Sequence, residues 1–115
     1  MFDIADSKTI ASHLSTAGAD VYTCPADRMA HINLLQITNV DGNGAADFTG
    51  SVYVAVSGVT SYFAYFIPIP AKAAYTPLGE KLSLWLKAGD KIHLSASADG
   101  DLDSLLSVME YYLPE

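Results

Sequence analysis

The sequence contains few cysteine and basic residues, on which disulfide formation, metal binding and nucleic-acid binding depend. Its one cysteine, Cys24, cannot form an internal disulfide and has no metal-ligand spacing around it. Beside Pro25, Cys24 is expected to be a small buried apolar residue. The chain has one arginine, Arg28, and five lysines that are scattered singly. Because phosphate backbones attract clustered basic residues, this scarcity argues against nucleic-acid binding.

Long hydrophobic runs are also missing. Glycine, serine, threonine and proline interrupt the longest uncharged stretch, residues 48–71. A transmembrane helix needs about 20 mostly apolar residues in a row, so we expect no membrane partner. The N-terminus, MFDIADSKTI, carries acidic residues where a secretion signal would carry a basic region and then an apolar core. We therefore expect the protein to stay in the cytosol unless a larger assembly carries it out.

What the chain does have is acidic charge and ample apolar residues. Thirteen Asp and Glu against six Lys and Arg give a formal net charge of −7, which favours solubility. Half of the 115 residues are hydrophobic, so a single domain of this length can fold without disulfides or metal. We divide the chain into an N-terminal arm, residues 1–19, and one domain, residues 20–115.

The domain reads as a series of β-strands. Residues 30–40 are β-prone, but their alternation breaks near Leu34, which indicates either a bulge or a strand covered on both faces. Residues 81–87 and 91–98 alternate on either side of Ala-Gly-Asp and form the strongest predicted hairpin. Alternation predicts an aliphatic core that contains Val52, Val54, Val56, Leu82, Leu84, Leu86, Ile92 and Leu94.

Seven or eight such strands, with turn sequences between them, predict an all-β fold. The fold class is an antiparallel β-sandwich, jelly-roll-like, with an N-terminal arm. A β-barrel with the same number of strands is the structural alternative.

Three segments resemble small β-sandwich proteins from the virions of tailed bacteriophages. Residues 21–26, VYTCPA, are similar to the opening short strand and Pro-Ala of those proteins. Residues 67–71, IPIPA, resemble their crossover after an aromatic strand. Residues 86–103, from LKAGDKI to ADGDLD, are similar to their closing hairpin. The resemblance covers roughly residues 20–112 and leaves the first 19 residues unmatched.

The resemblance implies a structural role in a virion. Such proteins are head decoration (cement) proteins, tail components or fibre domains. We expect a capsid decoration protein that binds the major capsid protein or other virion subunits, is homo-oligomeric on the particle and assembles in the host cytoplasm. The alternative is a tail- or fibre-associated module that binds a carbohydrate or a receptor.

The sequence offers little support for catalysis. His13, His31 and His93 lie far apart and lack the close spacing of metal ligands, so no metal site is expected. No serine has the frame of an activated nucleophile. We expect no enzyme activity, no catalytic residues and no cofactor.

Aromatic residues with polar groups are numerous for so small a domain. By strand parity, Tyr53 and Trp85 point away from the aliphatic core. Outward aromatics favour a protein interface; a covered second layer and a sugar platform are the alternatives. The arm could dock on a neighbouring subunit, and its deletion over residues 2–15 should then leave the domain folded. The candidate interface residues are Phe2, Ile4, Ile10, Leu14, Tyr53 and Trp85.

Overall fold

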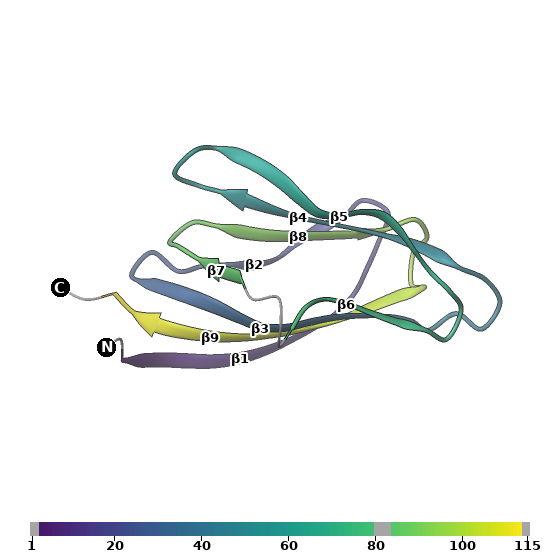
Figure 1. Ribbon diagram of the computed structural model, residues 1–115, viewed down its shortest axis with the longest axis horizontal. Helices are drawn as coiled ribbons and strands as arrows, with labels where there is room; N and C mark the ends of the chain where they lie inside the picture. The colour runs from purple at the N-terminus through teal and green to yellow at the C-terminus, as the bar shows by residue number, and fades with distance from the viewer. Residues whose placement is uncertain (1–2, 80–83, 114–115) are drawn as a thin grey trace.

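The computed structural model describes residues 3–79 and 84–113, and this part of the chain contains nine β-strands and no helix. The strands form two antiparallel sheets that face each other as two layers (Figure 1). The five-stranded sheet has the order β1-β9-β3-β6, with β7 also paired to β3, and the four-stranded sheet has the order β2-β8-β4-β5. This arrangement confirms the predicted all-β sandwich. The strands are β1 Ile4–His13, β2 Ala19–Thr23, β3 Arg28–Asn39, β4 Ala46–Val54, β5 Val59–Ile69, β6 Ala74–Leu78, β7 Leu84–Leu86, β8 Lys91–Ala96 and β9 Leu102–Tyr112.

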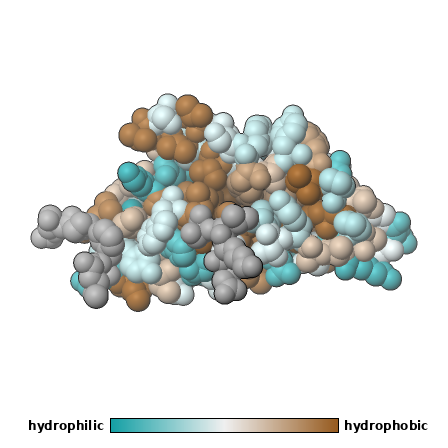
Figure 2. Space-filling view, in the orientation of Figure 1, coloured by the Kyte–Doolittle hydropathy of each residue, from teal (hydrophilic) through white to brown (hydrophobic). Residues whose placement is uncertain are grey.

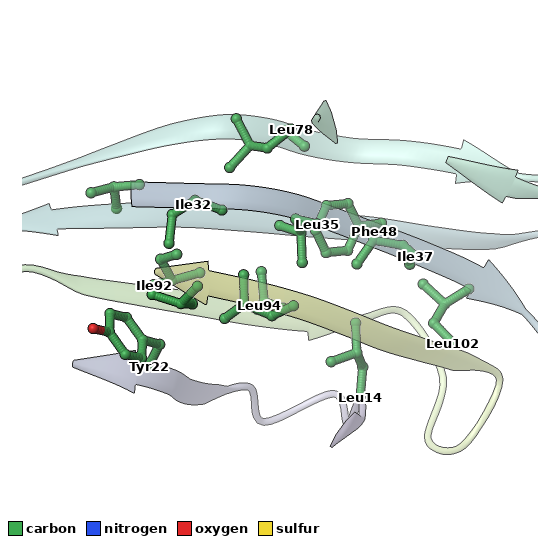
Figure 3. Close-up of a cluster of buried hydrophobic side chains, with 14 of the residues drawn as sticks. Leu14, Tyr22, Ile32, Leu35, Ile37, Phe48, Leu78, Ile92, Leu94 and Leu102 are labelled. Atoms are coloured by element: carbon green, nitrogen blue, oxygen red, sulfur yellow. The ribbon is translucent and has the colours of Figure 1, made fainter. Parts of the chain in front are cut away.

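Side chains from both sheets fill the space between the layers (Figure 3). Along β8 and β9 every second residue is buried, which is the pattern of a strand with one face on a core. Phe48 of β4 is the largest fully buried side chain, and it packs edge-on to Tyr75 of β6 across the sandwich. The largest buried aliphatic side chains include Ile32, Leu35, Ile37, Ile69, Leu86, Ile92, Leu94, Leu102 and Leu106.

The predicted core is correct in most positions. Val52, Leu86, Ile92 and Leu94 are buried, and Val54 and Leu84 pack against the core from partly buried positions. Leu82 lies outside the described residues. The prediction for Val56 is wrong, because β4 ends at Val54 and Val56 is 91% exposed in the turn to β5.

A bulge in β3 explains its broken alternation. The pairing of β3 with β9 shifts between Ile32 and Leu34, so that Ile32 and Leu35 both point into the core. An extra residue on one strand of an antiparallel pair produces this shift in parity. The structure therefore selects the bulge over a strand that is covered on both faces.

The predicted hairpin of residues 81–87 and 91–98 is wrong in its pairing. β7 pairs with β3 in one sheet, and β8 pairs with β2 and β4 in the other. The turn between them therefore crosses from sheet to sheet. Asp90 fixes this turn: its carboxylate accepts hydrogen bonds from the backbone N–H of Lys87 and of Ala55, each at 2.9 Å. Alternation correctly predicted strands at residues 84–86 and 91–96, and residues 81–83 lie outside the described part of the chain. Alternation carries no information about the sheet to which each strand belongs.

The N-terminal segment is not an irregular arm. β1 pairs with β9 from Ile4 to His13, and the next residue, Leu14, is buried at the crossover between the sheets. The inward face of β1 carries Lys8 and Ser12 beside Ile10, so hydrophobic alternation is weak and the strand is hard to recognise. Deleting residues 2–15 would remove a strand and a core residue, which corrects the expectation that the domain tolerates this truncation.

One buried charge joins both sheets. Glu110 of β9 is fully buried and accepts hydrogen bonds from Tyr22 Oη of β2 at 2.5 Å and from Arg28 Nη1 of β3 at 2.6 Å. Lys8 Nζ of β1 lies 3.1 Å from the same carboxylate. Burial alone would raise the pKa of Glu110, but these donors outweigh burial and hold it below its usual range. The carboxylate is thus a charged cross-link between four strands.

Candidate protein-interaction face

The outer face of the five-stranded sheet differs from the rest of the surface in its charge. Its outward positions follow from the alternating burial of β3 and β9 and from their pairing with β1 and β7. Among the described residues, these outward positions include one carboxylate and no lysine or arginine. We call this surface the Trp85 face. It consists of Ile4, Ser7, Thr9, Ala11, His13, Met29, His31, Leu34, Gln36, Thr38, Trp85, Asp103, Leu105, Ser107, Met109 and Tyr111.

A cluster of three rings, tilted relative to one another, lies at one end of this face. Trp85 is 49% exposed, and its ring centroid is 4.6 Å from that of His31 and 5.7 Å from that of Tyr111. The three rings come from β7, β3 and β9, which are adjacent in the sheet. His31 is held further by Asn33, whose Oδ1 lies 2.8 Å from His31 Nδ1. Packing on neighbours fixes the Trp85 ring, so binding costs little side-chain entropy.

The charged groups of the face lie at its opposite end. His13 Nδ1 and Asp103 Oδ1 are 2.6 Å apart at the far end of the β1–β9 pair. The hydrogen bond to Asp103, reinforced by its negative charge, raises the pKa of His13. Between this pair and the ring cluster, the outward residues of β9 are Leu105, Ser107 and Met109.

The dimensions of the face match those of a protein interface. β3 has 12 residues and β9 has 11. β1 adds 10 residues and β7 adds 3. At about 3.3 Å per residue and about 4.8 Å between strands, the face covers on the order of 600 Å², which approaches the roughly 800 Å² that each partner buries in a standard interface. The centres of such interfaces are depleted in charge and enriched in aromatic residues and methionine. The Trp85 face has this composition.

The candidate interface residues from the sequence separate into groups. Trp85 and Ile4 share the Trp85 face, because Ile4 pairs with Tyr111, and Ile4 is 62% exposed. Tyr53 is half-buried on the outer surface of the other sheet, so Trp85 and Tyr53 do not form one surface.

The remaining candidates from the N-terminal segment do not add to that face. Ile10 points inward from β1 and is partly buried against the core. Leu14 is 3% exposed in the core, so its assignment to an interface is wrong. Phe2 lies outside the described residues.

Sequence reasoning missed several residues of the face. Tyr111, Met109 and Leu105 alternate with the buried residues of β9, so the signal was present as strand parity. His31 could not be assigned, because the bulge near Leu34 obscured which side of β3 it occupies. A second missed group, Tyr62, Tyr65 and Phe66, is exposed on the edge strand β5.

The described residues offer no arrangement for metal or thiol chemistry. Within residues 3–79 and 84–113, no three His, Cys, Asp or Glu side chains converge as metal ligands. Cys24 is 2% exposed, as predicted, and burial, followed by the charge of Glu110, raises the pKa of its thiol. The described part of the chain also contains no helix that could span a membrane.

Comparisons with known proteins identify the fold and not a family. No protein-family model and no curated protein matches the chain. A chain from the disulfide-linked pili of Bacillus endospore appendages superposes with a TM-score of 0.56 at 16% identity, over 99% of this chain and 92% of that chain. A chain from the acid-stable capsid of Helicobacter pylori bacteriophage KHP30 gives 0.56 at 13% identity, over 100% and 92%. The protein therefore has the fold of small β-proteins found in capsids and pili.

Proposed function

We propose that the protein is a structural component of a tailed-phage virion, and specifically a capsid decoration protein. It attaches to the shell through the Trp85 face, and the major capsid protein is its principal partner. Copies are homo-oligomeric on the particle, and assembly takes place in the host cytoplasm. The observation that carries this proposal is an interface-sized face with almost no charge on a protein with a net charge of −7.

The fold comparisons support a role in an assembly. The pilus chain and the KHP30 capsid chain are each covered almost completely, so these two likenesses involve a whole small domain and not a fragment of a larger one. The mode of linkage in the matched pili is not available to this chain. Those pili are disulfide-linked. Here the single cysteine, Cys24, is buried inside the domain and cannot link folded subunits.

The test measures binding to purified phage particles. Trp85→Ala should lower the number of copies per particle at limiting protein concentration, because a Trp that packs against the partner in an interface often contributes about 2 kcal/mol or more. Its melting temperature should change little, because half of the side chain is already exposed. Tyr62→Ala, on the opposite sheet, is the matched control and should bind as the unchanged protein does. Equal binding by the two variants, or loss with Tyr62→Ala alone, would contradict attachment through the Trp85 face.

Copy number separates decoration from the alternative role as a tail or fibre module. Quantitative mass spectrometry of purified particles should find the protein in numbers comparable to the major capsid protein. A small, fixed number per particle would instead favour the tail or fibre, and its absence from particles would exclude both.

A further inference from the structure

The outer surface of the four-stranded sheet contains a groove of about 380 Å³. Cross-strand pairing builds it: Lys91 lies opposite Tyr53, and His93 lies opposite Ser51. On the far side of β4, Thr60 pairs with Tyr53 and Tyr62 pairs with Ser51. The volume lies within the roughly 300–1,000 Å³ of small-ligand sites. Its lining residues are Asp20, Ser51, Tyr53, Thr60, Tyr62, Lys91 and His93.

The polar side chains in the groove are already held by one another. Asp20 Oδ1 lies 3.0 Å from His93 Nδ1, and Asp20 Oδ2 lies 4.0 Å from Lys91 Nζ. The Lys91 amine also sits 5.8 Å from the centre of the Tyr53 ring. On its other side, His93 is confined by Gly18, where a Cβ would collide with His93 Nε2. The groups are therefore oriented before any ligand arrives.

The charge of the groove gives it no strong preference for a charged ligand. The formal charges of Asp20 and Lys91 cancel, and histidine is counted as neutral at pH 7. The protein as a whole carries −7, which repels anions such as phosphates and acidic sugars. A neutral ligand fits these electrostatics best.

The chemistry of the lining identifies the kind of neutral ligand. Four of the seven residues present hydroxyl groups, Asp20 only accepts hydrogen bonds, and Lys91 only donates them. Among the described residues, no valine, leucine, isoleucine or methionine lines the groove, and the rings of Tyr53 and Tyr62 supply most of its apolar surface. A ligand that matches must carry many hydroxyl groups and an apolar C–H face. These are the properties of a saccharide.

We propose that this groove binds a neutral saccharide. The sugar hydroxyls bond to Asp20, His93 and the serine, threonine and tyrosine hydroxyls, and a sugar ring packs on Tyr62. The surface continues along β5, where Tyr65 meets Tyr62 edge-on with centroids 5.0 Å apart, so that a second ring could follow. The groove and the Trp85 face are on opposite sheets, so the same molecule can attach to a particle and bind sugar.

The experiment is a titration of the ¹⁵N-labelled protein followed by amide chemical shifts. The neutral probes are lactose, maltotriose, cellotriose and N,N′-diacetylchitobiose; sialyllactose is the acidic counterpart of lactose. At least one neutral probe should shift the amides of residues 51, 53, 60, 62, 91 and 93 at up to about 10 mM sugar. Sialyllactose should bind no more tightly than lactose.

Two variants in the groove and one control variant on the other sheet test whether the sugar binds in the groove. Tyr62→Ala should weaken binding by roughly threefold to tenfold, in line with the loss of one ring contact. Asp20→Asn should also weaken it, because it removes the charge that holds Lys91 and His93. Trp85→Ala on the other sheet should have no effect. The proposal is overturned if none of the neutral probes shifts the groove, if the shifts lie elsewhere, or if both groove variants bind as the unchanged protein does. None of these outcomes bears on attachment through the Trp85 face.

Discussion

Glu110 shows how a single residue can hold the two layers of the sandwich together. A buried carboxylate is costly unless donors surround it, and Tyr22, Arg28 and Lys8 supply them. The contact with Glu110 also shifts the pKa values of Tyr22 and Arg28. Burial, with the hydrogen bond to Glu110, raises the pKa of Tyr22 far above its usual range. The hydrogen bond to Glu110 raises the pKa of Arg28, although desolvation opposes it.

Removing the charge of Glu110 should therefore destabilise the fold. Glu110→Gln removes the buried counter-charge of Lys8 and leaves Arg28 with only the exposed carboxylate of Asp27, 3.7 Å away; because both cations are partly exposed, the expected cost is about 2 kcal/mol. Urea unfolding followed by circular dichroism measures this cost. Asp3→Asn, at an exposed carboxylate, is the control and should change the unfolding free energy by less than about 0.5 kcal/mol. Equal stability of the two variants would show that the cluster contributes nothing net.

The same residue predicts how stability depends on pH. The pKa of Glu110 is lowered in the folded protein relative to its ordinary value of 4.5. Its contribution is therefore fully present above that value and is lost as pH falls below it, through the folded-state pKa. Unfolding curves between pH 7 and pH 3 should show a loss of stability that is smaller in Glu110→Gln. A parallel loss in both proteins would assign the effect to other carboxylates.

At the scale of elements, the bulge between β4 and β5 depends on a missing side chain. The register of these strands shifts on both sides of Gly50. The Phe63 ring occupies the space where a Cβ would lie, and the Phe48 ring is 2.8 Å from that position. Gly50 thus allows two aromatic rings to close over the backbone of β4.

Gly50→Ala should destabilise the domain by about 1–3 kcal/mol, because one of the two rings must move from a packed position. Gly44→Ala is the matched control, since no atom lies within 4 Å of the added Cβ. Thermal unfolding of both variants gives the comparison. A stable Gly50→Ala and a destabilised Gly44→Ala would contradict the assigned role of Phe63.

The individual strands were easier to predict from the sequence than the pairing of one strand with another. Alternation in residues 91–96 identified β8 and its core residues Ile92 and Leu94. A strand that is buried on one face has apolar residues at every second position, and this pattern is visible in the sequence alone. The placement of β7 in the other sheet depends on Asp90 and its contacts to Ala55, which are distant in sequence. β1 was missed for a related reason: its inward Lys8 is satisfied by Glu110, and that contact exists only in the folded protein.

The Trp85 face was predictable only in part. Parity placed Trp85 outward, and its half-exposed ring agrees. The neighbours that make Trp85 part of a surface, His31 and Tyr111, come from β3 and β9, and their association requires the strand order. Local periodicity gives the direction of a side chain, whereas a face requires knowledge of which strands are adjacent.

At the scale of the whole molecule, hydrophobic and charged groups are distributed unevenly. Hydrophobic residues also gather at the tip of the β4–β5 hairpin, at the top of the view in Figure 2, where Val56 is 91% exposed and Val59 is 52% exposed. The Trp85 face contributes almost nothing to the net charge of −7. Attachment through that face should therefore depend on apolar contact and not on ion pairs.

Washing with salt tests whether attachment depends on ion pairs. At about 0.5 M NaCl the screening length falls to about 4 Å, so attachment through exposed charges would weaken strongly. Particles washed at this concentration should keep their bound protein, as measured by sedimentation and quantitative mass spectrometry. Release by salt would place the contact on the charged parts of the surface.

The adjacency of β1 and β9 has a mechanical consequence. These strands are antiparallel neighbours, and the start of β1 and the end of β9 lie at the same end of a molecule that is 52 Å long (Figure 1). The first contact of the pair is close to both ends, since the backbone N–H of Tyr112 donates to the carbonyl oxygen of Asp3 at 2.9 Å. A force that pulls the two ends apart would break the ladder one bond at a time, like a zipper. A load that pulled β1 and β9 past each other along their length would instead act on many bonds of this ladder at once.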